Sequence, residues 1–122
     1  MDIRKLQKIA VTALEDVKAK DIEILNTSKL SALFDRVIIA TGDSNRHVKA
    51  LARSVHDKAR EADVVVIGIE GEETGEWVLV DLGDIVVHVM QPAVRAYYNL
   101  EELWKVVPKR PRKKVDVDTE DE

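Results

Sequence analysis

The chain has 122 residues, with 19 Lys and Arg against 23 Asp and Glu, no cysteine and 45% hydrophobic residues. This length suits a single domain, and the hydrophobic fraction excludes a wholly disordered chain. Without cysteine, disulfides and cysteine-based zinc sites are excluded. No apolar run approaches the roughly 20 residues of a membrane helix, and the first residues lack the apolar segment of a signal peptide. We therefore expect a cytoplasmic protein that makes no membrane contact.

The charges are unevenly distributed along the chain. Residues 1–104 hold 13 basic and 18 acidic residues, a net charge of −5, whereas residues 105–122 hold six basic and five acidic ones. An acidic domain repels phosphate and suits a basic protein partner, so we expect only peripheral contact with nucleic acid. The prolines and dense charge of residues 105–122 predict a disordered tail. Its basic cluster, PKRPRKK, is either a solvated segment or a weak, salt-sensitive contact for RNA phosphates.

Two helices and two strands are predicted in the first half of the chain. Apolar residues recur at helical spacing over residues 3–20, and alternation over residues 21–27 indicates a short strand. Residues 36–40, RVIIA, are apolar after Arg36 and mostly β-branched, which is typical of a strand buried on both faces. After a turn at Gly42, an apolar stripe predicts a second helix over residues 45–62.

The second half predicts three more strands and a short helix. Residues 64–69 form another apolar run that predicts a strand buried on both faces. Residues 77–82 and 85–90 predict two strands, and the Gly-Asp pair between them suits a tight hairpin. A helix over residues 92–104 begins with a proline, which the first helical turn tolerates.

This order of elements predicts a single α/β (α+β) domain over residues 1–104, built on one five-stranded mixed sheet. Two long helices are too few to cover both faces of such a sheet. We therefore expect the helices to pack mainly on one face and to leave the other face partly open, where a partner can dock.

Few residues suggest catalysis. His47 and His56 lie nine positions apart on the second predicted helix and face different directions. His88 lies inside a strand, which is typical of a hydrogen-bonded histidine in a sheet. The sequence contains no nucleophile elbow and no phosphate-binding loop, and its histidines lack metal-ligand spacing. We therefore expect no enzymatic activity, no metal and no cofactor.

One enzymatic alternative stays open. Asp81 and Asp84, together with the Gly42-Asp43-Ser44 turn, resemble parts of the magnesium site of nucleotidyl transferases. Because the first two are three residues apart across a turn, they do not share a strand face as an i, i+2 pair would. Turn and capping roles are the simpler interpretation, and a nucleotide-binding or nucleotidyltransferase-like enzyme is the alternative hypothesis.

Three segments of the sequence resemble a known family. They are ATGDSNRHVKAL (residues 40–51), GIEGEETGEWVLVDLGDIVVHVM (68–90) and YYNLEELW (97–104). These segments are similar to those of the ribosomal silencing factors, also called the Iojap-like family. The resemblance spans about residues 3–104, which is the predicted domain without the tail.

The resemblance implies a nucleotidyltransferase-like topology without the catalytic residues. It also implies a function. Family members bind the large ribosomal subunit through its ribosomal protein L-fourteen and sterically block joining of the small subunit. Translation is thereby repressed under nutrient limitation, as in stationary phase, and the factors are linked to assembly of the large subunit.

The resemblance further implies contact residues for the ribosomal protein. The apolar candidates are Trp77, Leu82 and Tyr98. The acidic candidates, which would pair with basic side chains, are Glu70, Asp81 and Asp84. Large aromatic side chains usually carry most of an interface's binding energy, and rim charges mainly steer association. Alternatively, Trp77 is a core aromatic at the start of a strand, and Tyr97 exchanges roles with Tyr98.

Other matched positions are expected to shape the fold rather than to bind the partner. They are Gly42, Ser44, Arg46, His47, Gly71, Gly83 and His88. Turn and capping roles are expected for the first four, with Arg46 also available for surface contact. Exposed strand edges and an apolar face would also suit a homodimer of the free protein.

Overall fold

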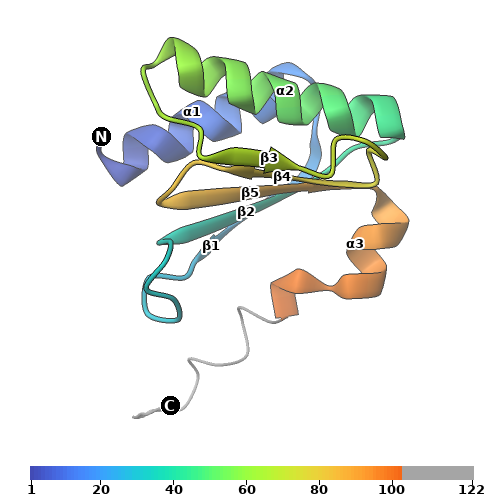
Figure 1. The fold of residues 1–122 in the computed structure, drawn as a ribbon. Coiled ribbons are helices and arrows are strands. Elements are labelled where there is room, and N and C mark those ends of the chain that lie inside the picture. The colour runs from blue at the N-terminus through green and yellow to red at the C-terminus, as the bar shows by residue number, and fades with distance from the viewer. Residues whose placement is uncertain (103–122) are drawn as a thin grey trace.

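The computed structural model describes residues 1–102 and contains three helices and five strands. In chain order they are α1 (Ile3–Asp16), β1 (Lys20–Asn26), β2 (Arg36–Thr41), α2 (Asn45–Glu61), β3 (Gly68–Glu70), β4 (Trp77–Asp81), β5 (Ile85–Met90) and α3 (Pro92–Tyr98). The strands form one mixed sheet, so the predicted α+β class is confirmed (Figure 1). The predicted tail lies outside the described residues, as do the last two residues of the predicted domain.

The strand order in the sheet is β1-β2-β5-β4-β3. Only β2 and β5 pair in parallel, and the other neighbours are antiparallel. Both parallel strands lie inside the sheet, where side chains on both faces are covered. In β2, Val37 and Ile39 pack on one face and Ile38 and Ala40 on the other, as the apolar run predicts.

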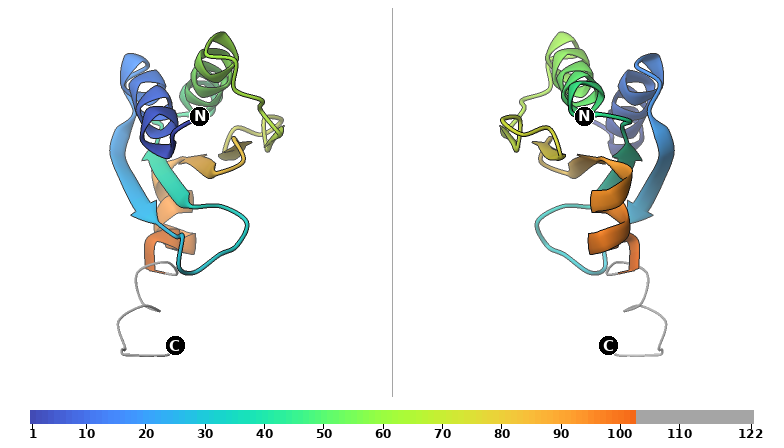
Figure 2. Two further views of the ribbon diagram at one scale, coloured as in Figure 1. Left: turned by 90° about the vertical axis from the view of Figure 1, so that its left-hand side faces the viewer. Right: turned by 90° about the vertical axis from the view of Figure 1, so that its right-hand side faces the viewer.

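Helices α1 and α2 lie side by side over one face of the sheet (Figures 1 and 2). Each begins with a side-chain cap, because Asp2 accepts a hydrogen bond from the Arg4 amide and Ser44 accepts one from the His47 amide. Their apolar stripes, which include Leu14 and Leu51, pack on the sheet to form the larger of two buried clusters.

The opposite face carries a smaller buried cluster of Leu25, Val37, Ile39 and Met90. Helix α3 lies on this side, and it covers only part of the face (Figure 1). The expectation that one sheet face stays partly open is therefore confirmed. We call this surface, on the side of the sheet away from α1 and α2, the open face.

Two predicted elements differ from the prediction. The strand predicted over residues 64–69 is reduced to Gly68–Glu70, and Val65 and Ile67 are 78% and 65% exposed. This run leads into β3, the outermost strand of the sheet. Its packing on the core beneath the helices is therefore limited to Val64, Val66 and Ile69, which are only partly buried. The helix predicted over residues 92–104 is interrupted after Tyr98, because Asn99 adopts the left-handed conformation with φ 50°. Residues 100–102 are helical again, and residues 103 and 104 lie outside the described residues.

Candidate functional site

The open face is defined by the alternation of side chains along β4. Val78 and Val80 are buried in the cluster beneath the helices. Successive strand residues point to opposite faces, so Trp77, Leu79 and Asp81 point to the open face. Strand pairing places Leu79 beside His88 of β5 and Trp77 beside Met90. One strand thus supplies an aromatic, an aliphatic and an acidic side chain to the same surface.

Trp77 and His88 form a hydrogen-bonded pair on this surface. The Trp77 indole Nε1 donates to His88 Nδ1 at 3.0 Å. Burial lowers the pKa of His88 from 6.5 to about 4, so the ring is neutral at pH 7 and its Nδ1 can accept. The sheet histidine predicted at position 88 therefore holds the tryptophan ring in place.

Tyr98 extends this pair into an aromatic cluster. Its ring centre lies 5.0 Å from that of Trp77, with an angle of 47° between the planes. Tyr98 is 55% exposed, whereas Tyr97, which contacts it edge-on, is 82% exposed. Of the two tyrosines, Tyr98 is the one that packs on the sheet tryptophan, while its ring still faces solvent.

Arg95 fixes α3 on the open face. Its Nη1 donates to the Asp21 carbonyl at 2.6 Å and to Thr41 Oγ1 at 2.8 Å, and its Nε donates to Glu101 Oε2 at 2.9 Å. The arginine side chain is only 12% exposed. These contacts join α3 to both β1 and β2, so they also determine where Tyr98 meets Trp77.

Beside the aromatic cluster lies a hollow of about 610 Å³. Its apolar wall includes Leu33, Phe34, Leu79 and Val86. Asp81 and Asp84 also line it, and together with Glu70 they make the surroundings acidic. The open face therefore combines aromatic and aliphatic area with negative charge, which fits a partner with apolar and basic side chains.

The structure brings most of the predicted contact residues together, with one exception. Glu70 is paired with Leu79 across β3 and β4, so it shares the open face with Trp77 and Asp81. Asp84 is exposed in the β4–β5 hairpin. Leu82, in contrast, is 5% exposed and packs beneath the helices with Val80. The prediction that Leu82 lies on the contact surface is therefore wrong, because its side chain points to the same face of the sheet as those of Val78 and Val80.

The predicted turn residues support the loops around the site. Gly71 has φ +90°, and a Cβ atom there would lie 2.1 Å from the Trp77 carbonyl oxygen. Gly83 also has φ +90°, in the hairpin, where its amide donates to Asp81 Oδ1. At Gly42 a Cβ would lie 2.8 Å from Val48 Cγ2. The first two positions require glycine for its backbone conformation, and the third requires it for close packing.

The GDSNRH segment links the two long helices. The Asp43 amide donates to His47 Nδ1 at 2.8 Å, so the ring proton is on Nε2, which donates to the Val17 carbonyl at 2.7 Å. His47 thereby ties the start of α2 to the end of α1, and Arg46 beside it is exposed. This histidine has a structural position and faces neither the hollow nor the aromatic cluster.

The geometry does not assemble a nucleotidyl transferase site. Gly42 bonds Met90 at the end of β5, whereas Asp84 precedes the start of the same strand. The six residues of β5 separate these ends by roughly 17 Å. Among residues 1–102, the structure contains no group of three or more metal-ligating side chains that could hold an ion. Likewise, none of the helices described is long and apolar enough to span a membrane.

Sequence reasoning missed two residues of the site. Leu79 could have been found, because alternation along β4 places it with Trp77 and Asp81. Arg95 gave no usable signal, because Asp21 and Thr41, which it contacts, lie 74 and 54 positions away in the sequence.

The fold is that of a small α+β domain, with its two long helices over one side of its sheet and a partly open, aromatic and acidic surface on the other. Comparison with known sequences narrows this class. The whole chain, residues 1–122, matches the family described as ribosomal silencing factor during starvation. The chain belongs to this family.

Relatives and a solved structure agree with the assignment. A ribosomal silencing factor from Chromobacterium violaceum is 64% identical over 104 residues, 85% of each protein. One from Bacillus subtilis is 43% identical over 108 residues, 88% of this chain and 92% of that protein. A crystal structure of a Chromobacterium violaceum protein is similar in fold, with a TM-score of 0.85, 57% identity and 98% of each chain covered. A mouse protein named mitochondrial assembly of ribosomal large subunit protein 1 is 33% identical over 99 residues, 77% of this chain and 42% of that protein.

Proposed function

We propose that the protein binds the large ribosomal subunit through ribosomal protein L-fourteen and blocks joining of the small subunit. The observation that carries the proposal is the Trp77–Tyr98 aromatic pair, in which Trp77 is partly buried and Tyr98 is 55% exposed. The pair lies beside an acidic rim on a sheet face that none of the helices within residues 1–102 fully covers. In this proposal the protein represses translation under nutrient limitation by occupying a surface, and it catalyses no reaction.

The chemistry of the open face supports a basic protein as the partner. Glu70, Asp81 and Asp84 are placed around the apolar area, where they can pair with lysine or arginine side chains. Rim pairs of this kind add roughly 0–1 kcal/mol each, and they raise the association rate and fix orientation. The aromatic pair supplies the apolar area at the centre.

Steric blocking needs no chemistry to be effective. When the free factor is present at about 100 times its dissociation constant, subunit joining is opposed by roughly 2.7 kcal/mol, or about a hundredfold. The names of three relatives favour the ribosome as the partner. The bacterial relatives are called ribosomal silencing factors, and the mouse relative is named for assembly of the large subunit. A contribution to large-subunit assembly is therefore part of the proposal.

The contact surface is tested by substitution of the aromatic pair. Trp77→Ala and Tyr98→Ala should each weaken co-sedimentation with purified large subunits by at least tenfold, as expected for interface hot spots. Tyr97→Ala is the matched control, since Tyr97 is the more exposed tyrosine and does not contact Trp77 in the described structure. Wild-type binding by folded Trp77→Ala and Tyr98→Ala variants would refute the assignment of the open face.

A second copy of the chain is the rival occupant of the same face. Light scattering of the free protein shows whether it is a dimer or a monomer. If a dimer forms through the open face, Trp77→Ala makes it monomeric, and added large subunits compete with the dimer. If the protein is a monomer, the face is free for the ribosome.

A further inference from the structure

The charges of the protein are sorted between its two layers. Helices α1 and α2 together hold eight basic and four acidic residues, a net charge of +4. The rest of residues 1–102 holds five basic and fourteen acidic residues, a net charge of −9. The overall acidity of the domain therefore conceals a basic helical layer on the side away from the open face (Figure 2).

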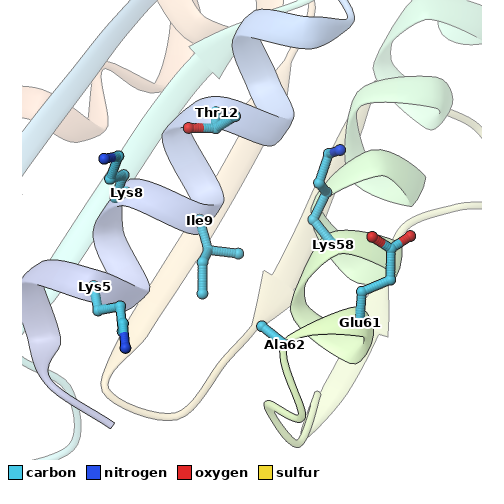
Figure 3. Close-up of a pocket in the computed structure, with 7 residues that line it drawn as sticks. All are labelled: Lys5, Lys8, Ile9, Thr12, Lys58, Glu61 and Ala62. Carbon is cyan, nitrogen blue, oxygen red and sulfur yellow. The ribbon is translucent and has the colours of Figure 1, made fainter.

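Part of this positive charge surrounds a groove between the two helices. Figure 3 shows Lys5, Lys8 and Ile9 of α1 on one side, and Lys58, Glu61 and Ala62 on the other. The groove has a volume of about 340 Å³. Its floor is apolar and its rim carries three lysines and one glutamate. Lys5 and Lys8 are one helical turn apart and both exposed, so their ammonium groups are available to a ligand from solvent.

We propose that this groove binds the phosphate backbone of duplex RNA. Lysine ammonium groups spaced along a helix face match the regular spacing of phosphates, and binding releases the counterions of the RNA. The lining contains no aromatic side chain on which an unpaired base could stack. Recognition is therefore of the backbone and independent of sequence. The proposal does not depend on the ribosomal protein contact, which uses the opposite face.

Two acidic residues at the groove tune its charge. Lys58 Nζ lies 3.4 Å from Asp16 Oδ2, and both side chains are about half exposed, so this ion pair is weak and can be exchanged for a phosphate. Glu61 lines the groove itself, where its carboxylate opposes an incoming phosphate. Removal of the Glu61 charge should therefore strengthen RNA binding.

The test measures fluorescence anisotropy of a labelled RNA hairpin with about ten base pairs, titrated with the full-length chain at about 50 mM salt. The double variant Lys5→Gln/Lys8→Gln should lower the affinity by roughly three- to tenfold. It should also reduce the slope of log affinity against log salt by about 2, because two phosphate contacts are lost. Glu61→Gln should raise the affinity by roughly two- to threefold.

The matched control is Lys20→Gln/Lys29→Gln, which removes the same charge from exposed lysines outside the helical layer. It should leave affinity and salt slope close to those of the wild type. Trp77→Ala should also bind RNA normally, which separates this surface from the open face. The basic cluster of residues 108–114 is present in every variant.

Three results would overturn the proposal. The first is wild-type affinity and salt slope in Lys5→Gln/Lys8→Gln, which would move RNA binding to another surface. The second is an equal loss in the control pair, which would reduce the effect to net charge. The third is displacement of the RNA by ATP at the same phosphate concentration, which would indicate a nucleotide pocket instead of a backbone site.

Discussion

Acid should destabilise this protein through His88. In the unfolded chain this histidine has its ordinary pKa of 6.5, whereas burial lowers the folded value to about 4. Between pH 4 and pH 6.5, His88 is protonated in the unfolded chain and neutral in the folded protein. The free energy of unfolding therefore falls as the pH drops from 6.5 to 4, and the contribution of His88 is complete above pH 6.5.

The size of the effect follows from the two pKa values. One pH unit of difference between them corresponds to about 1.4 kcal/mol. The contribution of His88 that is lost is roughly 2 kcal/mol at pH 5 and approaches roughly 3 kcal/mol below pH 4. Protonation also removes the acceptor of the Trp77 indole N–H, so the tryptophan ring loses its partner as the stability falls.

Urea unfolding of the wild type and of His88→Asn, at pH 7.5 and pH 5, measures this contribution. Asparagine keeps an acceptor near the Nδ1 position but does not titrate, so the variant should lose about 2 kcal/mol less than the wild type on acidification. His56→Asn, at a partly exposed histidine of α2 that contacts Asp57, is the control for loss of a histidine elsewhere. Equal pH dependence in wild type and His88→Asn, or an NMR titration of His88 near pH 6.5, would refute the reasoning.

Two further predictions concern the supports of the open face. Gly71→Ala should lower the free energy of unfolding by about 2 kcal/mol or more, since a Cβ would press on the Trp77 carbonyl at positive φ. Gly68→Ala, whose added Cβ has open space around it, should change it by less than about 0.5 kcal/mol. Arg95→Gln should cost about 2 kcal/mol by urea unfolding and weaken large-subunit binding, because α3 loses its charged hydrogen bonds to β1 and β2. Arg53→Gln, which breaks an exposed ion pair with Glu72, should cost less than about 1 kcal/mol.

The contrary results are equally specific. Equal stability of the two glycine variants would mean that the loop before β4 adjusts without strain. Normal subunit binding by a destabilised Arg95→Gln would mean that the position of α3 does not matter for the contact.

Much of the fold was predictable because its signals are local. The β-branched run of β2 indicated a doubly buried strand, and Ser44 indicated the start of α2. The prediction of a strand buried on both faces over residues 64–69 was wrong for a physical reason. Composition alone cannot distinguish an inner strand from an edge strand. Here only Gly68–Glu70 forms a strand beside β4, and Ile67 adds one backbone hydrogen bond to Asp81.

The candidate site was predictable in part. Successive residues of a strand point to opposite faces, so Leu79 points to the open face and Leu82 to the face beneath the helices. The alternation along β4 was therefore enough to replace Leu82 by Leu79 among the predicted contact residues. The position of Arg95 and the basic helical layer were not predictable in the same way. Arg95 is positioned by contacts with segments that are distant in the sequence. The basic helical layer is hidden in the net charge, which sums the basic helices α1 and α2 with the acidic remainder of the domain.

The central claim is that the protein keeps ribosomal subunits apart by occupying a face of the large one. The most direct measurement mixes purified subunits with increasing amounts of the protein and follows joined ribosomes on a sucrose gradient. The account predicts that joined ribosomes decrease as the protein saturates the large subunit, and that Trp77→Ala leaves them unchanged. Undiminished joining at saturating wild-type protein would contradict it.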